Sequence, residues 1–451
     1  MNRTKSIFSI LFASLSSFSQ LNPAITNWLI NTTNIMGRHY VAGNSTPIND
    51  NVLANVQTVQ YSSNFVYVST QGIPAYITGP FQDGNPSLAS AQNAIFKISL
   101  NPIQNTGTAI NTTGGNIGIF INGVALFDYR DGVSWNNTTM ALCGGPGNSP
   151  CPGPPGTSQA WNRDAVIAEK AGFDCSKAHP AMGNYHHHQN PSAFNLDLTI
   201  ISSVCNLYAA DGLYKIDSTK HSPLIGYAYD GFPIYGAYAF KNANGTGGVV
   251  RMKSSYILNT GTSRTNGPNV STTYPLGYFR EDYQYIATSA STPDYLDAHN
   301  GRFCVTPEYP NGIYCYFATV DKNWNSAYPY VVGPTFYGTV TASKVTSITE
   351  AVTTYSPGLP TSLGEMTDAI ENVVVFPNPA SDFVGIQLND LNKVDRTIEL
   401  YDLNGKLLQR TNLHQGSTVA YFDTRILYGG EYLIRIPTDA GIITRKVILV
   451  K

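Results

Sequence analysis

Residues 117–123 read Ile-Gly-Ile-Phe-Ile-Asn-Gly and predict a β-strand that runs into a tight turn. Apolar side chains recur along this stretch at the short period of a pleated strand. The Asn-Gly dipeptide at its end is favoured in two-residue hairpin turns. Residues 65–69, Phe-Val-Tyr-Val-Ser, show the same strand pattern earlier in the chain. We therefore expect a mainly β fold.

The composition is typical of a secreted β-rich chain. Only 12% of the 451 residues are charged, whereas a typical soluble protein has about 25%. The chain contains 29 Tyr and 40 Gly, residues that suit half-solvated strands and tight turns. Its 27 Lys and Arg nearly balance 29 Asp and Glu, giving a net charge of −2. The sequence therefore offers no basic surface for nucleic acid or anionic membranes.

The first 20 residues have the three parts of a signal peptide. A basic start at residues 1–5 precedes an apolar run at residues 7–15, and small residues around Ser17-Phe-Ser19 offer a cleavage site close to Gln20. The apolar run is too short to span a bilayer in the mature protein. Because no later segment reaches that length, we expect an exported chain with no transmembrane helix.

Shifts in composition divide the remainder into three parts. Residues 21–345 form a β-rich body, residues 346–371 are a low-complexity stretch typical of a linker, and residues 372–451 form a compact unit with short strands. Within the body, residues 158–171 predict a helix that ends at Gly172. The expected architecture is a large β-rich domain with one or few short helices, followed by a small terminal domain.

Six cysteines fit an oxidising compartment. They allow several disulfide connectivities, and the sequence does not choose among them. Local pairing is the simplest solution, and it joins residues 143 and 151, 175 and 205, and 304 and 315. A hairpin turn at residues 307–312 would bring Cys304 and Cys315 face to face. Cys175 lies close to His179 and could instead bind a metal.

Residues 372–451 carry a series of ordered motifs. They are Phe376-Pro-Asn-Pro-Ala-Ser-Asp-Phe383, Ile398-Glu-Leu-Tyr-Asp-Leu-Asn-Gly405, Gly430-Glu-Tyr-Leu-Ile-Arg-Ile436 and Lys446-Val-Ile-Leu-Val-Lys451. Together they resemble a type A C-terminal sorting domain of the type IX secretion system. Apolar alternation within them predicts a small immunoglobulin-like β-sandwich.

The resemblance of residues 372–451 implies transport across the outer membrane of a bacterium of the Bacteroidetes type. The type IX secretion machinery would be the partner of this domain. The protein would then be secreted or held at the outer-membrane surface, with attachment to lipopolysaccharide after the domain is removed. The alternative is a generic immunoglobulin-like module that binds another partner, since such sandwiches carry unrelated functions.

Three consecutive histidines, residues 186–188, follow Tyr185. If this stretch is extended, its side chains alternate between two faces. His186 and His188 then share one face, while Tyr185 and His187 share the other. Two imidazoles at this spacing can supply two ligands of a metal site.

Two more histidines belong to the candidate metal site. His179 is the natural third ligand, because a turn at residues 182–184 can fold its loop back over the strand. His221 is a fourth candidate. A three-His site suits copper or zinc and leaves a coordination position open for water or substrate. The alternative is a surface histidine cluster with no physiological metal.

Residues 185–188, Tyr-His-His-His, resemble the Tyr-His-Tyr-His motif after which the YHYH family is named. The third position departs from the motif, but both motif histidines are in place. The resemblance covers about residues 60–325 and includes Gly118-Ile-Phe-Ile-Asn-Gly-Val124, His221-Ser-Pro-Leu-Ile-Gly226 and Asn300-Gly-Arg-Phe-Cys304. It implies membership of the family but brings no activity with it.

Three functions compete for the body of the chain. We favour transition-metal binding at the cell surface without turnover. The second is a metal-dependent hydrolase or copper oxidoreductase, with Asp230 or Glu308 as the candidate general base. The third is a non-catalytic adhesion or glycan-binding protein. A carboxylate beside the metal would favour catalysis, but the sequence does not place one, so it leaves open whether the chain is an enzyme.

Overall fold

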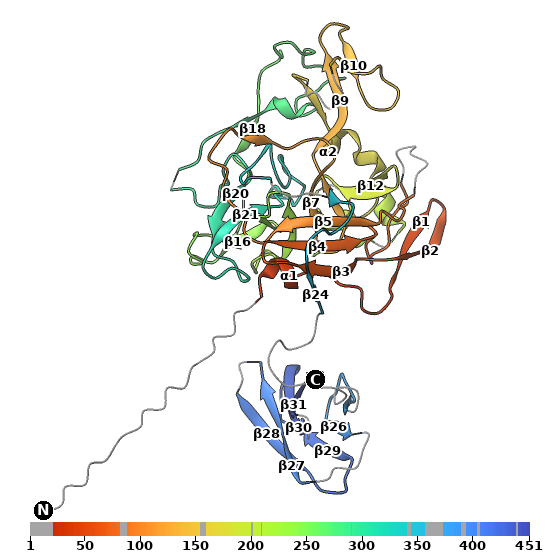
Figure 1. The fold of residues 1–451 in the computed structure, drawn as a ribbon, viewed down its shortest axis with the longest axis vertical. Helices are drawn as coiled ribbons and strands as arrows, with labels where there is room; N and C mark the ends of the chain where they lie inside the picture. Colours follow the sequence, from red (N-terminus) through yellow and green to blue (C-terminus); the bar gives the residue numbers. More distant parts are fainter. Residues whose placement is uncertain are drawn as a thin grey trace, which may run out of the picture. The chain divides into compact units, whose positions relative to one another are not determined.

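The computed structural model describes residues 21–81, 88–153, 159–199, 202–208, 210–289, 291–340, 344–356, 373–388, 394–403, 406–438 and 441–451. The chain divides into two compact units, Met1–Leu359 and Pro360–Lys451 (Figure 1). The expected signal peptide at residues 1–20 lies outside the described residues. Among the described residues, none of the helices has the length and apolar character that crossing a membrane requires.

The prediction of a mainly β fold with few short helices is confirmed. In the described part of the chain the α-helices are α1 (Pro23–Thr26) and α2 (Ala165–Ala168), each four residues long. The first unit gathers most of its strands into two larger sheets, which are flanked by short ribbons (Figure 1).

The larger sheet of the first unit has eight strands. Their order is β12 (Ala178–Ala181), β13 (Asn184–His187), β8 (Ala125–Phe127), β7 (Asn116–Phe120), β14 (Leu224–Ala228), β15 (Pro233–Tyr235), β21 (Ile313–Phe317) and β20 (Gly301–Cys304). β13 pairs parallel with β8 and β15 pairs parallel with β21, whereas the other neighbours pair antiparallel. The two strands that carry the candidate histidines therefore form one edge of this sheet.

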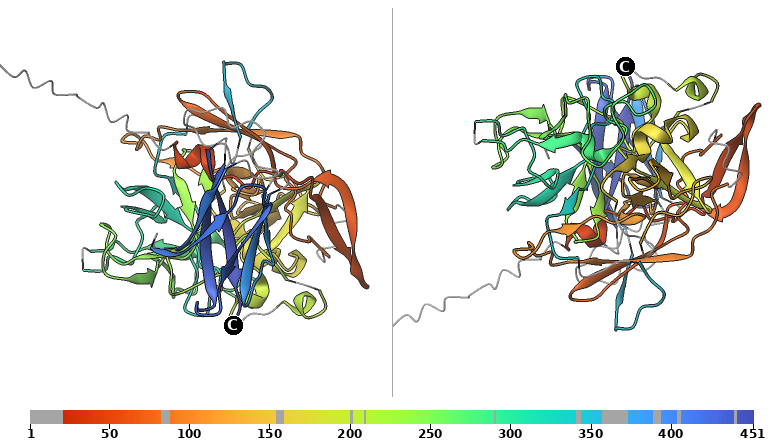
Figure 2. Two further views of the ribbon diagram at one scale, coloured as in Figure 1. Left: turned by 90° about the horizontal axis from the view of Figure 1, so that it is seen from below. Right: turned by 90° about the horizontal axis from the view of Figure 1, so that it is seen from above.

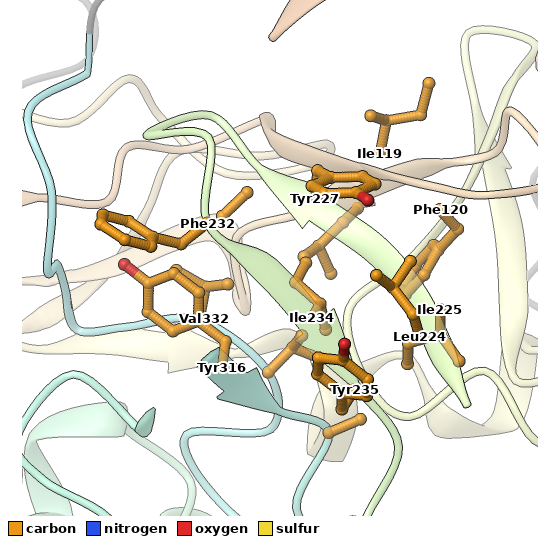
Figure 3. Close-up of a cluster of buried hydrophobic side chains, with 14 of the residues drawn as sticks. Ile119, Phe120, Leu224, Ile225, Tyr227, Phe232, Ile234, Tyr235, Tyr316 and Val332 are labelled. Atoms are coloured by element: carbon orange, nitrogen blue, oxygen red, sulfur yellow. The ribbon is translucent and has the colours of Figure 1, made fainter. Parts of the chain in front are cut away.

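The second sheet has five antiparallel strands. Their order is β23 (Lys344–Val345), β5 (Ala94–Ser99), β4 (Phe65–Thr70), β3 (Val56–Tyr61) and β24 (Thr353–Tyr355). Val68 and Phe96 of this sheet share one buried core with Ile119 and Tyr227 of the larger sheet. Figure 3 shows the part of the core around Tyr227 and Ile234. Burial of apolar surface, worth about 25 cal/mol per Å², makes this core the main favourable contribution to folding.

The first unit extends beyond residue 345. Strand β24 pairs with β3, with Thr353 opposite Tyr61. The part of the expected linker that is described up to residue 356 therefore belongs to the folded first unit. The rest of the expected linker, residues 357–371, lies outside the described residues.

Short ribbons complete the first unit. They are β1 (Met36–Val41) with β2 (Asn44–Leu53), β9 (Arg130–Asn136) with β10 (Ala141–Cys143) and β11 (Asn162–Asp164), β16 (Tyr238–Phe240) with β17 (Val249–Arg251), β18 (Tyr256–Leu258) with β19 (Tyr283–Tyr285), and β6 (Ile110–Asn111) with β22 (Thr335–Phe336). The β1–β2 ribbon stands out from the body of this unit (Figure 2).

The helix expected over residues 158–171 is wrong in its extent. The stretch contains β11, then α2, then a 3₁₀ turn at Lys170–Gly172. β11 pairs with β9, which holds the start of the stretch extended. The Asp164 side chain accepts hydrogen bonds from the N–H groups of Val166 and Ile167, so it caps α2 and sets its start. Strand pairing and this cap override the helix propensity of the residues.

Two of the three expected disulfides are present. Cys143 is bonded to Cys151 and Cys175 to Cys205, with Cα–Cα separations of 4.8 and 5.3 Å. Because Cys175 is in a disulfide, its sulfur is not a thiolate ligand, and the alternative role in a metal site is wrong.

The third expected disulfide is wrong, since Cys304 and Cys315 are both free and buried. The hairpin of β20 and β21 forms as predicted, but Cys304 lies opposite Ile313 and Cys315 lies opposite Arg302. The two cysteines are therefore offset by two positions along the ladder instead of facing each other.

The second unit consists of a three-stranded and a four-stranded sheet. The strands are β25 (Val373–Phe376), β26 (Phe383–Leu388) and β29 (Val419–Asp423) in one, and β28 (Leu407–Leu413), β27 (Arg396–Asp402), β30 (Gly430–Thr438) and β31 (Gly441–Leu449) in the other. Buried residues from both sheets, among them Ile386, Leu400 and Ile434, form one core. The expected two-sheet arrangement is therefore present in the described residues.

Candidate metal centre

The hairpin of β12 and β13 brings the candidate histidines together. The two strands are joined by a turn in which Met182 and Gly183 have φ of 50° and 83°. The pairing places His179 opposite His186, where Cβ atoms of cross-strand neighbours lie about 5 Å apart. His188 lies two residues beyond His186, on the same face. The hairpin therefore collects three imidazoles at the edge of the eight-stranded sheet.

The three imidazoles point at a common centre. One ring nitrogen from each of His179, His186 and His188 lies within 4.8 Å of the other two. The Nε2 atoms of His186 and His188 are 3.0 Å apart. All three side chains are buried, with exposed fractions of 5%, 1% and 4%. Sequence analysis predicted this trio, and the structure brings its members together.

Backbone carbonyls fix the orientation of two of these rings. His186 Nδ1 lies 2.8 Å from the carbonyl oxygen of Asn184, and His188 Nδ1 lies 2.5 Å from that of Asp128. A carbonyl only accepts, so both Nδ1 atoms carry the hydrogen and donate it. Burial, and then the charges of His188 and His179, lower the pKa of His186 well below its usual value. Neutral rings of this tautomer present a lone pair at Nε2, as metal-bound histidines do.

Glu169 supplies a carboxylate that sequence analysis missed. Its Oε2 lies 3.2 Å from His179 Nε2 and 3.3 Å from His188 Nε2. This oxygen is buried and makes no hydrogen bond of ordinary geometry within the described residues. Burial alone would raise the pKa of Glu169, but the interactions with His179 and His188 outweigh it and hold the pKa far below its usual range. Glu169 is therefore an ionised carboxylate that faces the three imidazoles.

Two aromatic rings enclose the cluster. Phe127 stacks on His186, with ring centroids 3.7 Å apart and planes 19° apart. Phe173 lies edge-on to His179 at 5.0 Å. These rings exclude water from one side of the cluster, whereas the Glu169 side chain is 24% exposed. Part of the Glu169 side chain therefore reaches the surface, whereas its Oε2, which faces the cluster, is buried.

The opposite face of β13 is closed by ordinary contacts. His187 Nε2 lies 2.9 Å from the hydroxyl of Tyr76, and its ring lies edge-on to Phe120. The Tyr185 hydroxyl donates to Asp174 Oδ2 at 2.8 Å. Burial lowers the pKa of His187 to about 3, so this ring is neutral near pH 7. The alternation predicted from the sequence is confirmed.

His221 is not a member of the cluster. Its Nδ1 lies 2.7 Å from the carbonyl oxygen of Ser222, and its ring lies edge-on to Tyr235. Among the described residues, the metal-binding geometry includes His179, His186 and His188 only. Glu308, one of the two carboxylates considered as a general base, also contacts Tyr235, whose hydroxyl donates to Glu308 Oε2 at 2.7 Å.

Asp230, the other candidate base, has structural partners. It is completely buried and accepts hydrogen bonds from the Tyr316 hydroxyl at 2.6 Å and the Gly338 N–H at 2.8 Å. Burial raises its pKa to about 6. These bonds tie a turn of the eight-stranded sheet to the segment around residue 338, so the carboxylate has a role in folding.

Three of the six separations among His179, His186, His188 and Glu169 suit a tetrahedral metal ion, whereas the remaining separations between imidazole nitrogens lie within 4.8 Å. Four donors bound about 2.0–2.1 Å from a zinc ion lie about 3.3–3.4 Å from one another. Nε2 of His186 lies 3.0 Å from Nε2 of His188, and Glu169 Oε2 lies 3.2 Å from Nε2 of His179 and 3.3 Å from Nε2 of His188. These three separations are close to this value. Three imidazoles and one carboxylate are a common ligand set for divalent transition metals.

Comparison with protein families identifies the end of the chain. Residues 374–451 match the model described as the secretion system C-terminal sorting domain. This type IX domain directs the protein to secretion or to the outer-membrane surface. A search of curated proteins finds no match to the chain.

A second family model covers the part of the chain that holds the cluster. Residues 95–330 match the model described as YHYH protein, and this range is more than half of the 451 residues. It includes Asp128, Glu169 and all three clustered histidines. This chain belongs to the YHYH protein family.

Proposed function

We propose that the YHYH domain of this exported protein binds a copper or zinc ion through His179, His186, His188 and Glu169. The observation that carries the proposal is the 3.0 Å separation between Nε2 of His186 and Nε2 of His188. In both rings the other nitrogen, Nδ1, donates to a backbone carbonyl. Two lone pairs that face each other at this distance repel unless a cation lies between them. That cation is a proton when one of the rings is charged, and it is the metal ion in the proposed site.

The carboxylate supports the same conclusion. Glu169 is ionised, and its Oε2 faces His179 and His188, whose interactions with it hold its pKa far below the usual range. A partly buried charge of this kind is costly unless a cation or a set of donors compensates it. A divalent metal compensates it, and the carboxylate in turn lowers the net charge of the metal centre.

The ligand set also bears on which metal is held. Imidazole nitrogens suit both copper and zinc, and at a site of given geometry Cu²⁺ binds more tightly than Zn²⁺. With four protein donors the site is closed, as in metal sites that hold an ion without turnover. We therefore rank metal binding above catalysis.

A metal-dependent hydrolase is the second candidate, and the exposure of Glu169 favours it. The Glu169 side chain is 24% exposed, so this carboxylate lies between the buried imidazoles and the solvent. In that case Glu169 would accept a proton from a metal-bound water instead of binding the metal itself. Replacement of Glu169 by Gln separates the roles: a ligand loses metal affinity, whereas a base keeps affinity and loses hydrolysis.

Elemental analysis tests the proposal in its simplest form. The protein is purified from its native host without an affinity tag and analysed for first-row transition metals. We expect close to one equivalent of copper or zinc per chain. Protein that is folded but contains neither metal, and that takes up neither on titration, would contradict the proposal.

Processing at the two ends completes the proposed function. We infer that residues 1–20 are removed on export and that residues 372–451 are removed at the cell surface, where the protein is joined to lipopolysaccharide. Support comes from the sorting domain at residues 374–451. Mass spectrometry of the surface protein should find a mature chain that begins near residue 21 and ends before residue 372. A full-length chain at the surface would contradict the removal step.

A further inference from the structure

A cavity of about 350 Å³ with a mainly apolar wall lies on the first unit, apart from the metal cluster. We call it the Arg38–Asp211 pocket, and its wall includes Leu29, Arg38, Tyr76, Asn122, Asp211 and Leu213. Its volume is at the lower end of the range for small-molecule sites, about 300–1,000 Å³. The pocket therefore has room for a ligand of a few heavy atoms.

Two opposite charges line this pocket without pairing. Arg38 donates to the carbonyl oxygen of Ala75 at 3.3 Å, and Asp211 accepts from the N–H of Gly212 at 2.8 Å. Within the described residues, neither side chain forms an ion pair with the other or with another charged group. Both are exposed to solvent. A ligand that carries both a negative and a positive group can meet each with its opposite charge.

A buried amide supports the pocket wall. Asn122 is only 2% exposed, its Oδ1 accepts from the N–H of Val124 at 3.2 Å, and its side chain hydrogen-bonds with Tyr76. It therefore fixes Tyr76 in the wall, and the charged groups that a ligand meets are Arg38 and Asp211.

The remaining wall is apolar. Leu29, Ile77 and Leu213 line the pocket together with the polar groups. Such a wall favours an aliphatic group on the ligand, because its burial removes apolar surface from water. The pocket thus combines an anion site, a cation site and an apolar wall.

We propose that the Arg38–Asp211 pocket binds a free α-amino acid with an aliphatic side chain. Arg38 holds the carboxylate, since a guanidinium matches a carboxylate in geometry and charge. Asp211 holds the ammonium group, and the side chain lies against Leu29 and Leu213. This site is additional to the metal centre and does not depend on it.

One side chain of β13 links the pocket to the candidate metal centre. Tyr76 lines the pocket, and its hydroxyl lies 2.9 Å from Nε2 of His187. His187 occupies the face of β13 opposite to the metal cluster. His187, which lies between His186 and His188 in the sequence, therefore holds Tyr76 in the wall of the pocket.

Calorimetric titration of L-leucine into the mature full chain tests this proposal. We expect saturable binding of one equivalent. Arg38→Gln and Asp211→Asn should each weaken it by at least about tenfold, because each removes one charged contact. The matched control is Asp217→Asn, which removes an exposed carboxylate that is paired with Lys220 and does not line the pocket. This variant should bind leucine as the unmodified protein does.

Two leucine analogues test the same contacts without any mutation. 4-Methylpentanoate lacks the ammonium group and leucinol lacks the carboxylate, so each should bind at least about tenfold more weakly than leucine. The His186→Ala variant should lose metal binding but keep leucine affinity, which separates this proposal from the metal proposal. Folded protein that gives no saturable signal with leucine, or equal affinity for leucine and both analogues, would overturn the proposal.

Discussion

Both faces of β13 carry histidine side chains, but the ring nitrogens have different partners on the two faces. On one face, His187 is neutral, its Nε2 meets the Tyr76 hydroxyl, and its ring packs on Phe120. On the other face, the Nε2 atoms of His186 and His188 lie 3.0 Å apart, and that of His188 also faces the Glu169 carboxylate. The comparison shows that the partners of the ring nitrogens, and not the presence of histidine, separate a packing residue from a candidate ligand.

The largest expected effect is stabilisation by metal. At a free metal concentration about a thousand times the dissociation constant, the free energy of unfolding should rise by about 4 kcal/mol, since the ion binds the folded chain only. The increase should appear in thermal unfolding of the mature protein with Cu²⁺ or Zn²⁺, and a chelator should reverse it. If the His186→Ala variant gained as much stability from metal as the unmodified protein, the face of β13 that carries His186 would not be the face that binds metal.

The second effect concerns His187. His187→Ala should lower the free energy of unfolding by about 2–3 kcal/mol, because it leaves a cavity beside Phe120 and removes the partner of the Tyr76 hydroxyl. His186→Ala should cost less in metal-free protein, since it also relieves the crowding of three imidazoles around one centre. Urea unfolding in the presence of a chelator measures both. Equal losses of unfolding free energy in the two variants would show that the two faces of β13 contribute alike to stability, contrary to this account.

The third effect concerns the carboxylate. Glu169→Gln should weaken metal binding by about tenfold, because it keeps the shape of the side chain but removes the charge that faces the imidazoles. Glu308→Gln is the matched control, since Glu308 contacts Tyr235 and not the cluster. Competition with a chromophoric chelator measures both affinities. An unchanged affinity in the Glu169→Gln variant would exclude Glu169 as a ligand.

The smallest expected effect is a pH dependence of stability that arises on the face of β13 that carries Tyr185 and His187. Burial raises the pKa of Asp174, which accepts from Tyr185, from 3.8 to about 7. The folded state therefore binds more protons than the unfolded state between these values, and stability decreases as pH rises. Relative to Asp174→Asn, the unmodified protein should lose about 1 kcal/mol between pH 6 and 7. A constant difference between the two proteins over this range would show that the carboxyl is already ionised.

The trio of His179, His186 and His188 could be predicted from the sequence, because the alternation of side chains along a strand depends on local geometry alone. Side chains alternate along any strand, so an extended stretch at Tyr185–His188 already separates His187 from its neighbours. The turn at Met182 and Gly183 then places His179 opposite His186. The sorting domain was equally accessible, since its motifs lie in a fixed order within one short segment.

The features that were missed depend on contacts between distant segments. Glu169 would lie on a long helix if residues 158–171 followed their propensity, and only the strand pairing of Asp164 and its neighbours with β9 shortens that helix. The register of β20 and β21 likewise separates Cys304 from Cys315, although their hairpin was predicted. His221 was included because it is near the motif region in the sequence, but it contacts Tyr235 instead.

The most direct test of the metal centre is calorimetric titration of Cu²⁺ and Zn²⁺ into four proteins: the unmodified mature chain and the variants His186→Ala, His187→Ala and His188→Ala. We expect His186→Ala and His188→Ala to lose at least about 100-fold in affinity, because two imidazoles cannot complete the coordination shell. The folded fraction of His187→Ala should retain affinity within about threefold. Equal losses in all three variants, or no binding tighter than that of a polyhistidine tag to the unmodified chain, would contradict the metal centre.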